Sequence, residues 1–186
     1  MIKISGKFIT LRLVNLKDAE FILNLRAKKG EFLSKSNIDL SEQNEWLKKY
    51  KKREEGDLEY YFIIENKEQI AVGTIRIYDI DHENKKFTFG SFIVDANFAH
   101  KYSALEAITL IFDLAFDKMN LVKCFFDCRK DNEHANKFYS RFGAKLINKD
   151  SINLYYEYSS ELFQENRDKY LKIFKNHDSF FRSKKN

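Results

Sequence analysis

Three polar side chains recur in the segment DCRKDNEHANKFYSRFGA, residues 127–144, at a spacing that suits contact with a ligand. Successive residues of an α-helix are about 100° apart, so Asn132, Asn136 and Tyr139 form a polar line along one side of a helix here. The neighbouring apolar face, roughly 90° around the helix, consists of Ala135, Phe138 and Phe142. One face can therefore pack against the protein while the other contacts a bound molecule.

The same segment contains signals for both ends of that helix. Asp131 or Asn132 suits the N-cap position, because a short polar side chain there accepts a hydrogen bond from a free amide. Glu133 complements the positive end of the helix, and Gly143 suits the left-handed residue that follows the last turn. The sequence therefore predicts a short helix that ends at Gly143.

A second candidate for chemistry is the start of a helix predicted at Ser103. Ser103 and Glu106 have the spacing of a capping box. The preceding turn brings His100 and Lys101 to the same end, where free amides and the positive end of the helix dipole suit a phosphate or pyrophosphate. Every helix has such an end, so this feature alone leaves ligand binding open.

Several catalytic and binding motifs are absent from the sequence. There is no GxxxxGK loop, no GxGxxG, no HExxH and no CxxC, and the histidines at 82, 100, 134 and 177 lack the spacing of metal ligands. No combination of Ser, His and Asp indicates a hydrolase. We therefore expect no metal, no dinucleotide fingerprint and no phosphate-loop chemistry.

The composition indicates one core and an anionic ligand. A chain of 186 residues with 44% hydrophobic residues can bury a sizeable core without a second domain. The net charge of +5 favours an anionic partner without requiring nucleic acid. Nucleic-acid binding would rest on charge and aromatic content alone, so we expect no nucleic acid as a partner.

We expect a cytoplasmic protein without a membrane partner. The first residues, MIKISGKF, lack the apolar core of a signal peptide, and the apolar run at residues 107–116 is too short for a membrane span and contains Asp113. Cys124 and Cys128 are four residues apart in a predicted strand, so their Cα atoms lie roughly 13 Å apart, too far for a disulfide. Reduced thiols are typical of the cytoplasm.

Hydrophobic periodicity predicts regular elements along most of the chain. Strands are expected at residues 8–14, 58–65, 70–78, 86–94, 121–128, 145–148 and 153–158. Helices are expected at residues 18–30, 41–56, 103–118 and 131–143, and from residue 160 onward. The strand, helix and strand between residues 86 and 128 predict a right-handed crossover with parallel pairing. The fold class is therefore α+β, with one mixed, mostly antiparallel central sheet covered by helices on both faces.

We expect one domain over residues 1–160, a C-terminal helix docked on it over residues 161–175, and a flexible basic tail over residues 176–186. Ser160 can cap the C-terminal helix, and Ser41 can cap the helix that ends at Gly56. The pattern lapses into a loop between Gly30 and Ser41.

The order of these elements, with residues 87–118 and the segment DNEHANKFYSRFGAKL at residues 131–146, resembles the GCN5-related N-acetyltransferases (GNAT). The resemblance covers roughly residues 4–158 and is nearer the ribosomal-protein and amino-sugar acetylating branch than the histone branch. Its most specific part is Asn132, then Tyr139 seven residues later, then Phe142 and Gly143, which is similar to the family's Asn, Tyr and Phe/Gly sequence.

The resemblance implies acetyl-CoA as co-substrate, no metal, and a set of site residues. Tyr139 is implied as the general acid that protonates the departing thiolate, and Asn132 as a contact to coenzyme A, with Asn136 as a further candidate contact. A bulged strand and the turn before residue 105 are implied to bind the pantetheine and the pyrophosphate, through Phe92, Ile93, Val94, His100, Lys101, Tyr102, Ser103 and Ala104.

The chain departs from the family pattern in two places. In the turn only Ala104 conforms, while Ala99 and Tyr102 replace the residues that relatives usually have. Thr88 and Phe89 stand where many relatives have a glutamate, which leaves the general base open. The remaining candidates lie on the turn after residue 78, namely Asp79, Asp81, His82 and Glu83.

By this resemblance we expect an acetyl-CoA-dependent N-acetyltransferase that acetylates the primary amine of a small acceptor by direct attack in a ternary complex. A nucleotide-linked amino sugar is the preferred acceptor, because a sugar amine is less basic than a lysine-like amine and needs a weaker base. The alternatives are a protein N-terminus, as in the ribosomal-protein branch, and a non-catalytic binding module of the same fold. The positive net charge disfavours a polycationic acceptor. Monomer and homodimer both stay open.

Overall fold

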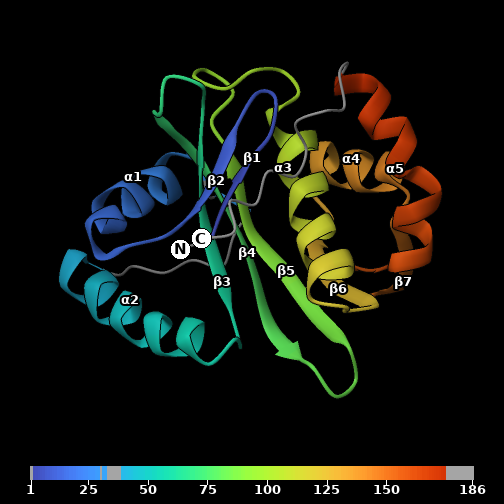
Figure 1. Ribbon diagram of the computed structural model, residues 1–186, viewed down its shortest axis with the longest axis horizontal. Coiled ribbons are helices and arrows are strands. Elements are labelled where there is room, and N and C mark those ends of the chain that lie inside the picture. The colour runs from blue at the N-terminus through green and yellow to red at the C-terminus, as the bar shows by residue number, and fades with distance from the viewer. Residues whose placement is uncertain (1, 30, 33–38, 175–186) are drawn as a thin grey trace.

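The computed structural model describes residues 2–29, 31–32 and 39–174, which form one eight-stranded sheet flanked by helices (Figure 1). The strands are β1 (Lys3–Ser5), β2 (Thr10–Leu13), β3 (Tyr60–Glu65), β4 (Ala71–Asp81), β5 (Lys86–Val94), β6 (Lys123–Arg129), β7 (Lys145–Lys149) and β8 (Asn153–Ser159). The helical elements are η1 (Leu16–Asp18), α1 (Ala19–Lys29), α2 (Leu40–Glu55), α3 (Ser103–Phe112), η2 (Asp113–Lys118), α4 (Glu133–Phe142) and α5 (Ser160–Phe174).

The described strands lie in the order β1-β2-β3-β4-β5-β6-β8-β7. Each neighbouring pair is antiparallel except β5 and β6, which are parallel and are connected through α3. α1 and α2 lie on one side of the sheet, and α3, α4 and α5 lie on the other (Figure 1). The predicted fold class, with its mixed, mostly antiparallel sheet and its parallel crossover, is confirmed.

Two apolar clusters cover the two faces of the sheet. The smaller one lies under α1 and α2 and includes Leu47 and Tyr50. The larger one joins the other face to α3, α4 and α5, and α5 contributes Phe163, Tyr170 and Phe174, each at most 2% exposed. The predicted C-terminal helix therefore packs against the sheet-bearing part of the chain.

Some predicted elements differ from the observed ones. β1 has no predicted counterpart, because three residues are too short for an alternating pattern to show. The helix predicted over residues 103–118 is α-helical to Phe112 and π-helical from Asp113 to Lys118, a change in hydrogen bonding that hydrophobic spacing does not reveal. Predictions for Gly30, for most of the loop that follows it, and for the tail at residues 176–186 lie outside the described residues.

Two helix starts were assigned to the wrong side chains. The cap of α2 is Asp39, whose carboxylate accepts from the Glu42 amide at 2.9 Å, rather than Ser41. The Ser159 hydroxyl, rather than Ser160, accepts from the Leu162 amide at 3.3 Å at the start of α5. In both cases the side chain that bonds to a free amide belongs to the residue directly before the first helical residue.

The predicted capping box of Ser103 and Glu106 is wrong. Ser103 is the first residue of α3 rather than its N-cap, and Tyr102 takes the N-cap position without a side-chain hydrogen bond. The Glu106 carboxylate accepts hydrogen bonds at 2.6, 2.7 and 2.9 Å from the amides of Lys7, Phe8 and Ile9. A tertiary contact with the loop between β1 and β2 therefore replaces the local one.

Candidate active site

β5 and β6 separate part of the way along the sheet. They pair only where Lys86–Thr88 faces Lys123–Phe125, although β5 continues to Val94 and β6 to Arg129. Among the described residues, the edge of β5 that faces β6 has no strand partner beyond Thr88, which leaves backbone polar groups there for a ligand. The two strands therefore define a wedge-shaped gap in the middle of the sheet.

A β-bulge lies in β5 beside this gap. Arg76 pairs with Gly90 and Thr74 pairs with Ile93, so β5 has one residue more than β4 between the two pairs. Ser91 takes a left-handed conformation with φ 47°, and its carbonyl accepts a hydrogen bond from the Thr74 hydroxyl at 2.8 Å. The bulge thus includes the predicted site residue Phe92 and directly precedes Ile93 and Val94, which pair with β4.

Tyr139 reaches from α4 into the same gap. Its ring lies 5.9 Å from the Phe89 ring of β5 and 4.8 Å from the Phe126 ring of β6, and only 8% of the residue is exposed. Among the described residues the hydroxyl has no hydrogen-bond partner, and it is not one of the fully buried unpaired atoms. Burial raises the pKa of this phenol well above its ordinary value, so it stays protonated.

The two predicted asparagines have different environments. Asn132 is the N-cap of α4, because its side-chain oxygen accepts from the Ala135 amide at 3.1 Å. Asn136 uses both ends of its amide within the protein, donating to the Arg129 carbonyl at 2.8 Å and accepting from the Tyr156 hydroxyl at 3.0 Å. Asn136 therefore ties α4 to β6 and β8, a structural role that the polar stripe did not indicate.

The start of α3 has free donors. Among the described residues, no hydrogen bond is formed by the Ala104 and Leu105 amides, while the Ser103 amide bonds to the His100 carbonyl at 2.8 Å. Tyr102 has φ −99°, a conformation open to any residue, so the absence of glycine there does not strain the turn.

The side chains around the start of α3 form an aromatic and basic surface. The His100 ring stacks on Phe8 at 4.0 Å, and the Tyr102 ring lies 5.9 Å from Phe8. The Lys101 ammonium lies 5.0 Å from the Tyr102 ring centre. Ser103 is fully buried, and among the described residues its hydroxyl has no hydrogen-bond partner. Free amides and a cation thus meet at one helix end, which suits an anion, while the Ser103 hydroxyl lies buried beneath it.

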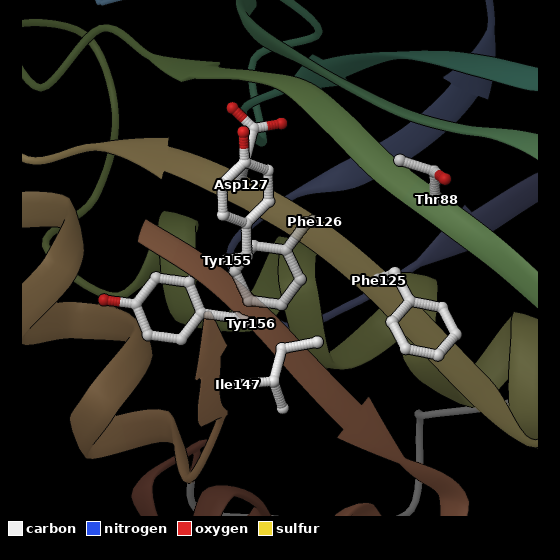
Figure 2. Close-up of a pocket in the computed structure, with 7 residues that line it drawn as sticks. All are labelled: Thr88, Phe125, Phe126, Asp127, Ile147, Tyr155 and Tyr156. Carbon is white, nitrogen blue, oxygen red and sulfur yellow. The ribbon is translucent and has the colours of Figure 1, made fainter. Parts of the chain in front are cut away.

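A pocket of about 200 Å³ opens where β5 and β6 separate (Figure 2). Its lining comes from β5, β6, β7 and β8 and consists of Thr88, Phe125, Phe126, Asp127, Ile147, Tyr155 and Tyr156. Side chains alternate along β6, so Asp127 points away from the buried Cys124, Phe126 and Cys128. The pocket therefore brings one carboxylate to the edge of the gap that Tyr139 enters.

Asp127 was not among the predicted site residues. It makes no hydrogen bond or ion pair with any other described residue. The pKa values of Tyr78 and Tyr139 are raised mainly by burial of these side chains. The negative charge of Asp127 is a smaller cause of both rises. The available signal was the alternation in KCFFDCR, where Asp127 is the one acidic residue and occupies the face opposite the cysteines.

The turn at residues 79–83, which was predicted as a possible source of the general base, lies outside this pocket. Asp81 accepts hydrogen bonds from the backbone and side chain of Asn84, both at 2.8 Å, which lowers the pKa of its carboxyl. The His82 Nε2 lies 3.0 Å from the Asp57 carbonyl oxygen. Neither residue lines the pocket, and Asp79 and Glu83 do not line it either. These side chains shape the hairpin between β4 and β5.

The described residues contain neither a metal-ligand cluster nor a membrane-spanning helix. No group of three or more His, Cys, Asp or Glu residues among them is arranged to hold a metal ion. Within residues 2–29, 31–32 and 39–174, every helix is too short or too polar to cross a membrane. Cys124 and Cys128 are both buried free thiols, as predicted.

Solved structures share this architecture. A structure described as apo FdhC, a nucleotide-linked sugar GNAT, is 34% identical, with a TM-score of 0.84 over 93% of this chain and 98% of that one. Spermidine N-acetyltransferase from Vibrio cholerae, in complex with CoA and spermine, is 19% identical, with a TM-score of 0.73 over 86% and 99% of the two chains. Ribosomal-protein-S5-alanine acetyltransferase from Vibrio fischeri is 16% identical, with a TM-score of 0.75 over 87% and 98%. The last two show a shared fold only.

A search of curated protein sequences gave no significant match. The family model for the acetyltransferase (GNAT) domain matches residues 9–145, which include the gap, the bulge, the start of α3 and all of α4. These features and this match agree, and the chain belongs to the GNAT family of N-acetyltransferases.

Proposed function

We propose that this protein transfers the acetyl group of acetyl-CoA to the primary amine of a nucleotide-linked amino sugar. The observation that supports this acceptor best is the 34% identity with a nucleotide-linked sugar GNAT over 93% of the chain. The net charge of +5 agrees with two anionic substrates, a coenzyme and a nucleotide.

The start of α3 and the gap between β5 and β6 together fit an extended acyl-CoA. The amides of Ala104 and Leu105 and the Lys101 ammonium offer donors and positive charge to a pyrophosphate. The unpaired edge of β5 beyond Thr88 offers backbone groups to an amide-containing arm such as pantetheine. The predicted contacts at His100, Tyr102 and Asn132 remain part of this proposal, while the Asn136 amide is already satisfied within the protein.

Acetyl-CoA supplies an activated thioester. The protein positions that thioester, donates hydrogen bonds to it and donates a proton to the leaving sulfur. A backbone amide at the β5 bulge donates a hydrogen bond to the oxyanion of the tetrahedral intermediate. This amide lies beside the gap, and on that side no described strand pairs with it. Tyr139 donates its phenolic proton to the leaving sulfur. The gap is apolar, so the departing thiolate is desolvated together with the phenol, which favours proton transfer between them.

Other acceptors follow from the more distant structural neighbours. The Vibrio cholerae neighbour is a spermidine acetyltransferase and the Vibrio fischeri neighbour acetylates a ribosomal protein, but at 19% and 16% identity they show the fold alone. A polyamine would meet a protein of net charge +5, which disfavours it. A ribosomal-protein N-terminus stays the second candidate.

The acceptor class can be tested by measuring CoA thiol release in parallel reactions. We expect turnover with nucleoside-diphosphate sugars that have an amine at C2, C3 or C4, and at least tenfold lower kcat/KM with spermidine or with a peptide that begins with alanine. A preference for the peptide or for spermidine would reassign the acceptor.

A thermal-shift titration with acetyl-CoA tests the first substrate separately. A ligand that binds only the folded state stabilises it by RT ln(1 + [L]/Kd), so we expect the melting temperature to rise with acetyl-CoA concentration. An unchanged melting temperature at millimolar acetyl-CoA would support the non-catalytic module instead.

A further inference from the structure

Acetyl transfer to an amine requires a base, and no residue has been assigned to that step. An ammonium group has no lone pair to attack the thioester, and the nitrogen must lose protons as the amide forms. Thr88 and Phe89, where the family resemblance leads one to expect a glutamate, cannot accept a proton at neutral pH. A base must therefore come from another strand.

Asp127 occupies the required place. Phe125 is the last residue of β6 that pairs with β5, and Asp127 is the next residue on the same face, so its carboxylate stands at the mouth of the gap. Thr88 and Tyr155 line the same pocket, and Tyr155 is the β8 residue directly opposite Asp127 (Figure 2). This pocket has space for a sugar ring beside the carboxylate.

Asp127 and Tyr139 approach the gap from opposite faces of the sheet. Tyr139 contacts Phe126, the residue before Asp127, and Phe126 points toward the larger core while Asp127 points away from it. A base on one face and an acid on the other suit a reaction in which the amine attacks from one side and the thiolate leaves on the other.

The neighbouring carboxylates are already in use. Asp150 accepts from the Tyr155 hydroxyl at 2.6 Å and from two backbone amides, which lowers the pKa of its carboxyl to about 2. Asp131 pairs with Arg129 at 2.5 Å, and Glu157 lies 4.0 Å from the Lys123 ammonium. Of the acidic side chains on β6, β8 and their adjoining turns, Asp127 alone both lines the pocket and lacks a partner among the described residues.

We propose that Asp127 is the catalytic base of the acetyl transfer and the group that holds the acceptor ammonium, a proposal that rests on the proposed function. One ammonium proton leaves to solvent through the Asp127 carboxylate, and the nitrogen lone pair then forms the C–N bond. The attacking nitrogen becomes cationic and far more acidic than a free ammonium, so the carboxylate takes its second proton. The C–S bond breaks, Tyr139 protonates the sulfur, Asp127 releases the second amine proton to solvent, and solvent returns one proton to Tyr139.

The balance of this step is one acetyl-CoA and one ammonium giving one amide, one thiol and one proton.

Thr88 offers a hydroxyl to the acceptor sugar in the same pocket, while Ile147 and Phe125 supply its apolar walls. The titratable groups within reach of the Asp127 charge are Tyr78, Tyr139, Tyr155 and Cys128.

The first test compares Asp127→Asn with Glu157→Gln. Both variants replace a carboxylate by an amide on the same face of the sheet, but Glu157 lies outside the pocket. We expect Asp127→Asn to lower kcat for the amine that the wild type acetylates by about 10²–10⁴-fold, with the Kd of acetyl-CoA unchanged within twofold. The difference in kcat between Asp127→Asn and the wild type narrows between pH 7 and pH 9.5, because the free amine becomes abundant in solution. Asp127→Glu recovers part of the wild-type rate. Glu157→Gln keeps wild-type turnover.

A second measurement needs no turnover. With CoA present, we expect the wild type to bind UDP-glucosamine at least fivefold more tightly than UDP-glucose, and Asp127→Asn to bind the two sugars equally. Wild-type turnover in Asp127→Asn, a retained preference for the amino sugar, or a loss of acetyl-CoA affinity that matches the loss of rate would each overturn the proposal for Asp127. A wild type that binds neither nucleotide sugar but acetylates another amine would overturn the acceptor class instead, and the kinetic test then uses that amine.

Discussion

Tyr139 combines a buried ring with a hydroxyl that no other described residue binds. Its ring packs between Phe89 and Phe126, so the position of the hydroxyl is fixed by packing. Burial keeps the phenol protonated by raising its pKa, which preserves the proton donor but makes it a weaker acid in the absence of substrate. The phenol is therefore suited to protonating a thiolate that is equally desolvated in the same gap.

The substitution Tyr139→Phe tests that role. The phenylalanine ring keeps the aromatic contacts and loses only the hydroxyl, so we expect kcat to fall about ten- to a thousand-fold with nearly unchanged acetyl-CoA binding. Steady-state thiol release and a binding titration measure the two effects. Tyr158→Phe is the matched control, because Tyr158 is fully buried in the larger core and its hydroxyl bonds to the Leu162 carbonyl at 3.4 Å. Equal turnover in both variants would remove Tyr139 from the mechanism.

At the level of elements, α3 is fixed by Glu106 and by the loop that precedes β2. Three amide hydrogen bonds end on one buried carboxylate, which joins the start of α3 to the edge of the sheet. A Cβ atom added at Gly6 would lie 2.5 Å from the Glu106 carboxyl carbon, so the carboxylate fits only beside a glycine. This contact therefore positions the helix end that we propose for the pyrophosphate.

Gly6→Ala should therefore destabilise the fold. Overpacking of a buried site typically costs about 1–3 kcal/mol, and we expect a decrease of that size in the free energy of unfolding, measured by urea titration. Gly56→Ala is the control, because the nearest atom to its added Cβ is 3.6 Å away, an ordinary contact. Equal stability of the two variants would show that the loop moves aside at little cost.

Asp113 links η2 to α5 in a similar way. Its carboxylate bonds to the Arg167 guanidinium at 2.8 Å, while its second oxygen is buried without a partner among the described residues. Burial raises the pKa of Asp113 to about 6, above its ordinary value of 3.8, and the opposing effect of Arg167 does not cancel that rise. The folded protein therefore binds this proton more tightly than the unfolded chain does.

The sign of the pH dependence follows. Protonation of Asp113 stabilises the folded state fully below pH 3.8, and this contribution is lost as the pH rises through about 6. We expect Asp113→Asn to melt at a higher temperature than the wild type at pH 7.5, by the equivalent of about 1–2 kcal/mol, and the difference to shrink toward pH 4.5. Thermal melts across this range test it, with Asp168→Asn on the exposed side of α5 as control. A difference that does not vary with pH would contradict the assignment.

For the molecule as a whole, the two faces of the sheet contribute different residues to the proposed site. On one face α3, α4 and α5 pack against the sheet, and Tyr139 enters the gap from that side. On the other face the sheet is covered by α1 and α2 near β3 and β4, and the pocket with Asp127 opens beyond them at β5, β6 and β8. At the gap between the parallel strands the two faces meet.

α5 completes the larger core behind that site. Tyr170 stacks on Phe142 of α4 with ring centres 4.5 Å apart, and its hydroxyl bonds to the Phe142 carbonyl. Since Phe142 ends the helix that contains Tyr139, the C-terminal helix supports the position of the proposed acid. The predicted limit of the domain at residue 160 stays a prediction.

The sequence by itself determined the type and order of most elements. The β-branched and aromatic residues of β3 to β5 and the spacing of apolar residues in the helices are local patterns set by side-chain burial. The limits of α4 were also local, since Asn132 caps its start and Gly143 takes φ 96° at its end. For the same reason the resemblance of α4 to one family could be recognised from its own residues.

Only the tertiary structure decided which polar groups are free to act. Asn132, Asn136 and Tyr139 look equivalent on a helix, but hydrogen bonds to β6 and β8 occupy the Asn136 amide and leave the Tyr139 hydroxyl unpaired. Glu106 matches a local cap but binds amides almost a hundred residues away. In the sequence, Asp127 is an exposed residue of a predicted strand. In the structure it lines a pocket, because β5 and β6 separate beside it. The physical reason is that periodicity reports burial along one element, whereas the partners of a polar group depend on which distant strands and helices the fold brings beside it.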